Sequence, residues 1–283
     1  MDINSLTAKY ELSDNEAKEL EGYIANRFEG IEPHKCETFE FIGVWKKLAA
    51  LGGIIGAAEV INKKLTAKLP IDFKNPDGIK LEIYDSLAGE IPIIYADDPQ
   101  DFESLVVNIV YKGRRPENIG QTGASFISGN TTRLIILSSK PYSNVPACEL
   151  SLDEKDWARR SMLIRRSHEC THYYTKQAFG ISNNILHDEL MADFIGLYDT
   201  FGFYKAEWFL RFMGVIEGSG GRMAVYTSGL SVSVTNAVAE LLTAAAYGLE
   251  KWSESEQFSV LSQAGRINEM CRLGITGMDG LVN

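Results

Sequence analysis

The sequence predicts an α+β fold, in which a small mixed or antiparallel sheet with a backing helix precedes an all-helical C-terminal part. Two observations predict it. Short runs of β-branched and aromatic residues appear after residue 71, and after residue 140 the pattern is almost entirely helical. We expect three parts: an N-terminal helical appendage at 1–70, an α/β subdomain at 71–180 and a helical subdomain at 181–283.

The N-terminal part is expected to hold two helices. Residues 13–16 read Ser-Asp-Asn-Glu, a capping box that opens a polar helix ending near Gly30. A second helix is predicted over 38–66 and includes the apolar stretch LAALGGIIGAAEVIN at 48–62. This stretch has 15 residues and contains Glu59, so it is too short to cross a bilayer and is expected to be a buried helix.

The sheet is predicted from short stretches between residues 79 and 137. Strands are expected at 79–84, 91–95, 124–128 and 131–137. Gly129-Asn130 would form the two-residue turn of a hairpin between the last two strands. Between the strand pairs, Asp98-Pro99 supplies a cap and a first-turn proline for a helix whose last turn is followed by Gly113.

A long helix is predicted after the last strand. Residues 151–154, Ser-Leu-Asp-Glu, form a second capping box, and Gly180 is a suitable end. One face of this helix carries Trp157, Ser161, Ile164, His168 and His172. Further helices are expected at 184–200, 203–216 and 231–250, the last of them after the glycine-rich sequence EGSGGR.

Composition narrows the classes of function. A net charge of −10 disfavours partners such as nucleic acid or an anionic membrane surface. The basic cluster Arg159, Arg160, Arg165 and Arg166 is expected to be a solvated helix face. The four cysteines lack C-x-x-C spacing, which fits a reducing compartment, and the N-terminus carries no secretory pattern. We therefore expect a cytoplasmic protein with no nucleic-acid or membrane partner.

Residues 165–174, RRSHECTHYY, carry the strongest functional signal. His168 and His172 are four residues apart, so on a helix they lie on one face at roughly 5–6 Å. Two imidazoles so placed can bind one ion with bonds of roughly 2.0–2.1 Å. Glu169 is turned about 100° from His168 and borders the metal position, as the general base for an attacking water must. The pattern predicts a metal site with Glu169 as its catalytic residue.

A third protein ligand is expected, because a catalytic zinc ion usually has three and leaves a fourth position for water. Thr175 and Ala178 stand where a longer three-histidine pattern requires Gly and His, so that pattern is excluded. Downstream, HDELMADFIG offers Glu189 as the ligand and Asp193, one turn later, as the carboxylate that accepts a spare imidazole N–H. Two neighbours of Glu189 remain alternative third ligands: His187 and Asp188.

H-E-x-x-H followed by E-x-x-A-D resembles the gluzincin group of zinc metallopeptidases, over about residues 130–200. The resemblance implies a zincin-like fold and a Zn²⁺ cofactor with His168, His172 and Glu189 as ligands. It also implies a peptide or protein substrate, which would add to an edge strand, for which TTRLIILSS at 131–139 is the candidate. Such enzymes use a Tyr or His to stabilise the oxyanion, and the sequence offers Tyr198, Tyr204, Tyr226 and His187 without choosing among them.

Three hypotheses of function follow. The leading one is a zinc-dependent metallopeptidase-like hydrolase. The second is a zincin-like binding or regulatory module that holds the metal without turnover, and the third is a metal-free helical interaction protein. Stoichiometric metal separates the third from the other two, and chelator-sensitive peptide cleavage separates the first from the second.

Overall fold

The computed structural model describes residues 3–129, 133–181 and 185–281. It divides into two compact units: unit 1 comprises Met1–His34 and Thr175–Asn283, and unit 2 comprises Lys35–Tyr174. These boundaries differ from those expected at residues 70 and 180. The first two helices pack with the C-terminal helices, whereas the next two pack on the sheet, so the N-terminal segment is no separate appendage. The second boundary falls inside helix α6 (Glu154–Phe179), which is continuous and contributes to both units.

Unit 2 is built on a four-stranded mixed sheet, as expected. Its strands are β1 (Ile79–Ser86), β2 (Gly89–Ala96), β3 (Ala124–Ser128) and β4 (Arg133–Ser138). Their order is β1-β2-β4-β3, in which β2 and β4 are parallel and the two outer pairs are antiparallel.

Strand β4 is not the edge strand that the resemblance to gluzincins implied. Strand β3 pairs along one side of it and β2 along the other, so the sheet edges are β1 and β3. All six residues of β4 are accordingly buried. Ser128 pairs with Arg133, which confirms the β3–β4 hairpin. The two-residue turn predicted at Gly129-Asn130 cannot be compared directly, because residues 130–132 lie outside the described residues.

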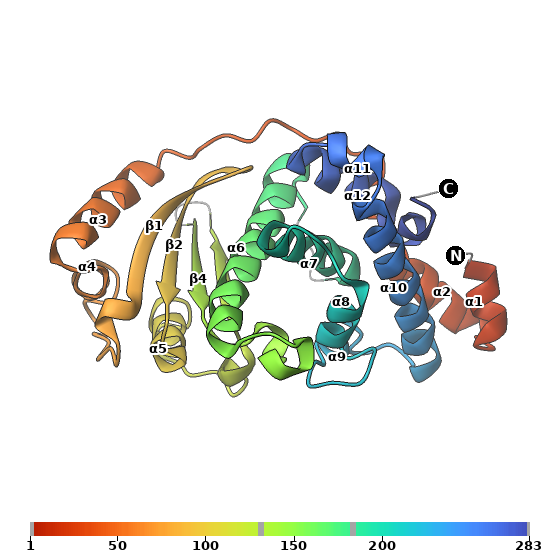
Figure 1. Ribbon diagram of the computed structural model, residues 1–283, viewed down its shortest axis with the longest axis horizontal. Helices are drawn as coiled ribbons and strands as arrows, with labels where there is room; N and C mark the ends of the chain where they lie inside the picture. Colours follow the sequence, from red (N-terminus) through yellow and green to blue (C-terminus); the bar gives the residue numbers. More distant parts are fainter. Residues whose placement is uncertain (1–2, 130–132, 182–184, 282–283) are drawn as a thin grey trace. The chain divides into compact units, whose positions relative to one another are not determined.

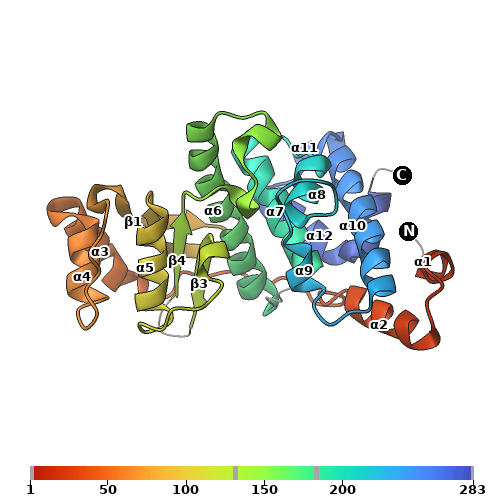
Figure 2. The same cartoon turned by 90° about the horizontal axis from the view of Figure 1, so that it is seen from below.

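The two faces of the sheet are covered by different helices, because side chains alternate along each strand. Helices α3 (Ile42–Ile55), α4 (Ala57–Lys64) and α5 (Pro99–Ile109) cover one face (Figures 1 and 2). Their core includes Trp45, Ile61, Phe102, Ile94 and Ile136. Helix α6 contacts side chains of the opposite parity. Its Tyr173 ring lies 5.8 Å from the ring of Phe126, and its Arg166 guanidinium lies 4.5 Å from the ring of Tyr84.

The segment predicted as one buried helix at 38–66 is two helices. Gly56, with φ of 93°, ends α3 and begins α4. Val60 and Ile61 of α4 are buried, but Val44 and Ile54 of α3 are 63% and 81% exposed. The prediction of a buried helix is therefore wrong for α3, because only one of its apolar faces meets the sheet. The predicted start of α5 is confirmed: Asp98 accepts from the backbone of Gln100 and Asp101.

Helix α6 begins two residues later than a capping box at Ser151 would give. Asp153 is the cap, because its carboxylate accepts from the backbone of Lys155 and Asp156 at 3.0 Å, whereas Ser151 adopts a left-handed φ of 57°. The helix ends at Phe179, and Gly180 follows with φ of 72°, as predicted.

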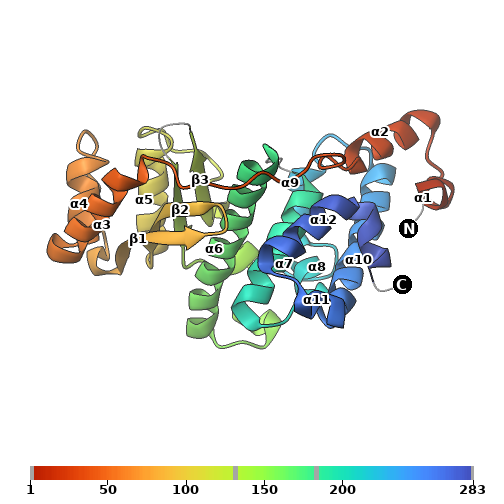
Figure 3. The ribbon, with the colours of Figure 1, turned by 90° about the horizontal axis from the view of Figure 1, so that it is seen from above.

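Unit 1 is entirely helical within the residues described. Its α-helices, all labelled in Figure 3, are α1 (Ile3–Lys9), α2 (Asp14–Ile24), α7 (Leu186–Phe201), α8 (Ala206–Met213), α9 (Met223–Tyr226), α10 (Val232–Ser253), α11 (Glu256–Val260) and α12 (Gln263–Gly277). The predicted Ser13–Glu16 capping box at the start of α2 is confirmed. The predicted end near Gly30 is wrong, because the helix ends at Ile24. The Tyr10 hydroxyl donates to Glu240 of α10 at 2.5 Å, which ties the N-terminal helices to this unit.

Helix α10 lies at the centre of unit 1, where it contacts α2, α7, α8, α11 and α12. In the part of the chain that the structure describes, it alone is long and apolar enough to cross a membrane, with a mean hydropathy of 1.2. Half of that apolar window is buried inside the unit, as in the core helix of a globular domain.

Candidate metal centre

The two histidines of the H-E-x-x-H sequence project from α6 toward one point. Their Nε2 atoms lie 3.1 Å apart, and their ring centroids are 4.7 Å apart. His168 is 6% exposed and His172 9% exposed, so both imidazoles are largely withdrawn from solvent. This follows from the four-residue spacing, because residues one turn apart share a helix face.

Tyr142 contacts the other nitrogen of His168. Its hydroxyl lies 3.0 Å from Nδ1, and only 3% of the residue is exposed. Tyr142 begins a one-turn 3-10 segment, Tyr142–Asn144, on the connection between β4 and α6. The sequence contained no spacing signal for this contact, because Tyr142 lies outside both motifs.

Helix α6 holds the connection that carries Tyr142 at three successive turns. Trp157 Nε1 donates to the carbonyl of Val145 at 2.8 Å, and Ser161 Oγ accepts from the backbone N–H of Tyr142 at 3.0 Å. Arg165 donates to the carbonyl oxygens of Ser138, Lys140 and Pro141.

The prediction that the basic cluster at 159–166 is a solvated helix face is therefore correct for only some of its arginines. Arg165 is 5% exposed, and Arg166 stacks on the Tyr84 ring. Arg159 and Arg160 instead pair with Asp156 near the start of α6. A charge pattern alone could not separate these pairs, because a guanidinium can satisfy buried carbonyl groups as well as contact water.

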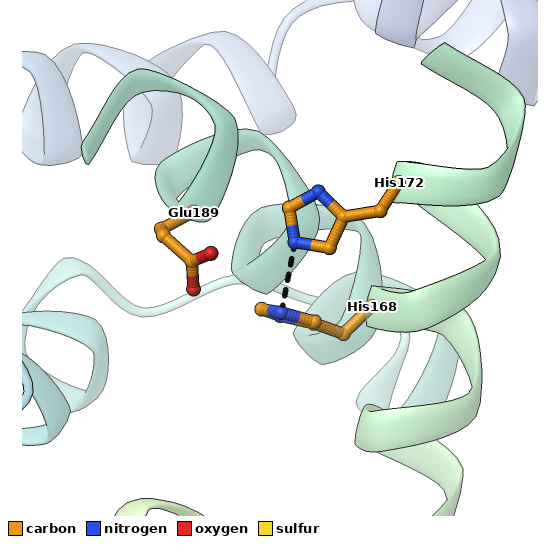
Figure 4. Close-up of side chains that lie close together, drawn as sticks. All are labelled: His168, His172 and Glu189. Carbon is orange, nitrogen blue, oxygen red and sulfur yellow. Dashed lines mark hydrogen bonds between the residues drawn. The ribbon is translucent and has the colours of Figure 1, made fainter. Parts of the chain in front are cut away.

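Glu189, on α7, completes a group of three potential ligands. One ligand atom from each of His168, His172 and Glu189 lies within 4.8 Å of the others. Figure 4 shows the two rings and the carboxylate directed toward one another from the two helices. Glu189 is 4% exposed. The structure thus brings together the three residues that the sequence predicted as metal ligands.

Glu189 has charged and polar neighbours within unit 1. Tyr226 donates to Glu189 Oε2 at 2.8 Å, and Arg222 Nη1 lies 3.8 Å from the same oxygen. The second amino group of Arg222 pairs with Asp193, which is fully buried. Burial raises the pKa of Tyr226 far above its usual value, and the negative charge of Glu189 raises it further. Tyr226 therefore stays protonated and remains a hydrogen-bond donor.

The glycine-rich sequence between α8 and α9 places Arg222 and Tyr226. Gly221 and Arg222 donate through their backbone N–H groups to the carbonyl of Phe212, at 3.2 and 3.4 Å. A Cβ atom on Gly220 would lie 1.8 Å from the carbonyl oxygen of Arg211, so the loop can pass the end of α8 only with glycine there. The sequence did indicate this break, and Arg222 directly follows it.

The side chains of the two alternative third ligands, His187 and Asp188, have other neighbours in unit 1, although both residues lie beside Glu189 on α7. The His187 ring packs against Phe28, and its Nε2 lies 3.1 Å from the carbonyl of Met270. Burial lowers the pKa of His187 to about 4, so this imidazole is neutral near pH 7. Asp188 is 1% exposed and lies near Cys271, where its charge adds to the effect of burial in raising the pKa of the thiol.

The structure also places the predicted catalytic residue, the predicted partner of a ligand histidine and the candidates for oxyanion stabilisation. Glu169 is half-buried on α6 and lies outside the group of three ligand atoms. Asp193 pairs with Arg222, and the Tyr142 hydroxyl lies at Nδ1 of His168. Among the four candidates for oxyanion stabilisation, Tyr226 donates a hydrogen bond to Glu189. Tyr198 and Tyr204 instead pack their rings against Phe194.

The donor set suits a zinc ion. Two imidazole nitrogens and one carboxylate oxygen match a catalytic zinc site with three protein ligands. Tetrahedral bonds of about 2.0–2.1 Å place two nitrogens roughly 3.3 Å apart, close to the 3.1 Å between the two Nε2 atoms. These residues fit a zinc ion with little rearrangement of the α6 pair.

The fold and this group define an α+β protein with a two-histidine, one-carboxylate cluster of metal-ligand type. The chain belongs to a family of unknown function, DUF7005, whose profile matches residues 57–133 and 130–282. Comparison with curated proteins and with solved structures gave no match. Residues 168, 172 and 189 all lie within the matched ranges, whereas α1–α3 precede them.

Proposed function

We propose that this protein is a zinc-dependent metallopeptidase-like hydrolase of gluzincin type. The observation that carries the proposal is the convergence of His168, His172 and Glu189 within 4.8 Å, from the two helices that the motif predicted. A mixed sheet, followed by the histidine helix and then by the third-ligand helix, supports a zincin-like fold. Four free cysteines agree with a cytoplasmic location.

In this proposal the residues of the chain have separate tasks. His168, His172 and Glu189 would hold Zn²⁺, which when bound supplies Lewis-acid polarisation of the scissile carbonyl and a lower pKa for the attacking water. Glu169 would accept the proton of that water and deliver it to the leaving amine. Tyr226 and Arg222 lie at Glu189 and would donate to the oxygen on which negative charge develops. The substrate would be a peptide or protein, and the net charge of −10 disfavours nucleic acid.

One observation favours a second function, that of a metal-binding module without turnover. The guanidinium of Arg222 already lies beside Glu189 and Asp193, so a cation occupies the neighbourhood of the third ligand. Such a site could bind metal for stability or regulation. A test of the hydrolase must therefore measure metal and cleavage separately.

The test uses the purified chain with unfolded casein and a peptide library, with and without a chelator. We expect about one zinc per chain by elemental analysis and cleavage that the chelator abolishes. Glu169→Gln should keep the zinc and lose at least 100-fold in hydrolysis, because only the proton acceptor is removed. Glu154→Gln is the matched control, because Glu154 is an exposed carboxylate in the first turn of the same helix. This substitution should change neither the zinc content nor the rate of hydrolysis.

The outcomes separate the hypotheses. Stoichiometric zinc with undiminished cleavage in Glu169→Gln would refute the role of Glu169. Bound zinc without any cleavage in the wild type would favour the module. Absence of zinc from the purified chain, even after incubation with zinc, would remove both functions.

A further inference from the structure

The hydrogen bond between Tyr142 and His168 has no part in the mechanism above. We propose that Tyr142 is a positioning residue, which holds His168 so that the lone pair of Nε2 faces the metal position. In zinc sites this task usually falls to a carboxylate, a backbone carbonyl or water. The inference rests on the proposed function, because it concerns how the chain prepares one of the three ligands.

The positions of the protons explain why the contact matters. A neutral imidazole carries one N–H group, so a metal on Nε2 requires the proton to be on Nδ1. The Tyr142 oxygen, 3.0 Å from Nδ1, is placed to accept from that N–H. Without an acceptor there, a buried N–H would be left without a partner, at a cost of about 1–3 kcal/mol. Tyr142 thereby favours the tautomer that can bind a metal.

A hydroxyl group differs from a carboxylate because it can also donate. The two Nε2 atoms are 3.1 Å apart, so without a metal one of them must donate to the other. If His168 is the donor, its Nδ1 has no proton, and the Tyr142 hydroxyl can donate to it. Tyr142 therefore satisfies His168 with and without metal, whereas an ionised carboxylate could serve only one of the two tautomers.

Tyr142 is also held firmly enough to position a ring. Its backbone N–H and the neighbouring carbonyl groups are bound by Ser161 and Arg165, which lie on α6 with His168. The Arg165 guanidinium lies 5.3 Å from the Tyr142 ring centroid. Ser143 and Asn144 follow with φ values of 53° and 61°, a left-handed conformation that persists only where the surroundings fix it. One helix thus sets the position of both the hydroxyl and the imidazole.

The test compares Tyr142→Phe with the wild type by chelator competition with zinc alone. Loss of the hydroxyl should weaken zinc binding by about 10–100-fold, the usual effect of removing such a partner. Tyr95→Phe is the matched control, since Tyr95 lies in the same unit and its buried hydroxyl makes no hydrogen bond to a histidine ligand. Its zinc affinity should stay within about twofold of the wild type.

A second measurement needs no variant. In the zinc-loaded wild type, the Nδ1 proton of His168 should appear by NMR as a slowly exchanging proton, protected by the Tyr142 oxygen. In Tyr142→Phe that proton should exchange faster, whereas in Tyr95→Phe, which keeps the Tyr142 hydroxyl, its exchange should stay close to that of the wild type. The measurement on the wild type decides the question even if Tyr142→Phe fails to fold.

The failures can be told apart. Equal zinc affinity in the wild type and Tyr142→Phe, or zinc-loaded protein whose His168 lacks a protected Nδ1 proton, would overturn the role of Tyr142 and leave the proposed function intact. A wild type that does not bind zinc would overturn the proposed function, and this inference with it.

Discussion

The two sides of the candidate metal centre are held by different kinds of interaction. On α6, His168 contacts a neutral hydroxyl, and the segment that supplies it is bound mainly through backbone carbonyl groups. On α7, Glu189 and Asp193 are held by the charge of Arg222 and by Tyr226. The histidine side therefore depends on fixed shape and tautomer, whereas the carboxylate side depends on charge balance.

The charge of Arg222 is the largest determinant of the carboxylate side. Arg222→Met should leave Asp193 buried without this cation and lower the free energy of unfolding of the metal-free protein by about 3–5 kcal/mol. Zinc should restore more stability in this variant than in the wild type, because a dication replaces the missing charge. Urea unfolding with and without zinc measures both effects.

The matched control for Arg222→Met is Arg272→Met. Arg272 pairs with Glu269 but is 66% exposed, so its removal should cost less than about 1 kcal/mol. If Arg222→Met lost no more stability than this control, charge balance would not distinguish the carboxylate side.

The glycine-rich loop tests whether the carboxylate side also depends on shape. Gly220→Ala should destabilise the protein by about 1–3 kcal/mol or more, because its Cβ atom would meet the Arg211 carbonyl at 1.8 Å. The loop should move and carry Arg222 and Tyr226 away from Glu189. Gly221→Ala is the control, since nothing lies within 4 Å of its Cβ position. Thermal unfolding of the two variants should therefore differ, and similar melting temperatures would refute the packing argument.

The sequence predicted what is local along one helix. The four-residue spacing of His168 and His172 is a property of α6 itself, so the sequence was enough to pair them. For the third ligand on α7, the sequence left Glu189, His187 and Asp188 open, and only the resemblance to gluzincins favoured Glu189. Periodicity and capping residues likewise predicted the sheet strands and most of the helices. These features depend on residues that are close together in the chain, so the sequence alone contains the pattern that determines them.

The contacts that hold the ligands could not be predicted in the same way. Tyr142 reaches His168 across 26 positions, and Arg222 reaches Asp193 across 29, and no periodicity links either pair. The edge position that the resemblance implied for β4 was wrong for a similar reason. Its order in the chain did not reveal that β3 would fold back along its outer side. Each of these three contacts is fixed by tertiary packing between segments that are distant in the sequence.

One ion-pair network lies beside the segment that carries Tyr142, and it provides a measure of how far charge contributes to the histidine side. Glu103 accepts from Lys140 at 2.7 Å and also pairs with Arg115, while Lys140 donates to the carbonyl of Gly120. The hydrogen bond from Lys140 lowers the pKa of Glu103, and Arg115 lowers it further. Because the folded-state pKa is lowered, the network stabilises the fold fully above the unfolded pKa of about 4.3. The stabilisation is lost as the pH falls through the folded value.

Glu103→Gln should therefore cost about 1 kcal/mol near neutral pH and progressively less below about pH 4. Zinc affinity should hardly change, because Arg165 and Ser161 still bind the Tyr142 segment. Urea unfolding between pH 3 and 7, with Glu59→Gln in the exposed pair with Lys63 as the control, measures the difference. A cost that is the same at every pH would trace the effect to packing, and a large loss of zinc affinity would show that charge also governs the histidine side.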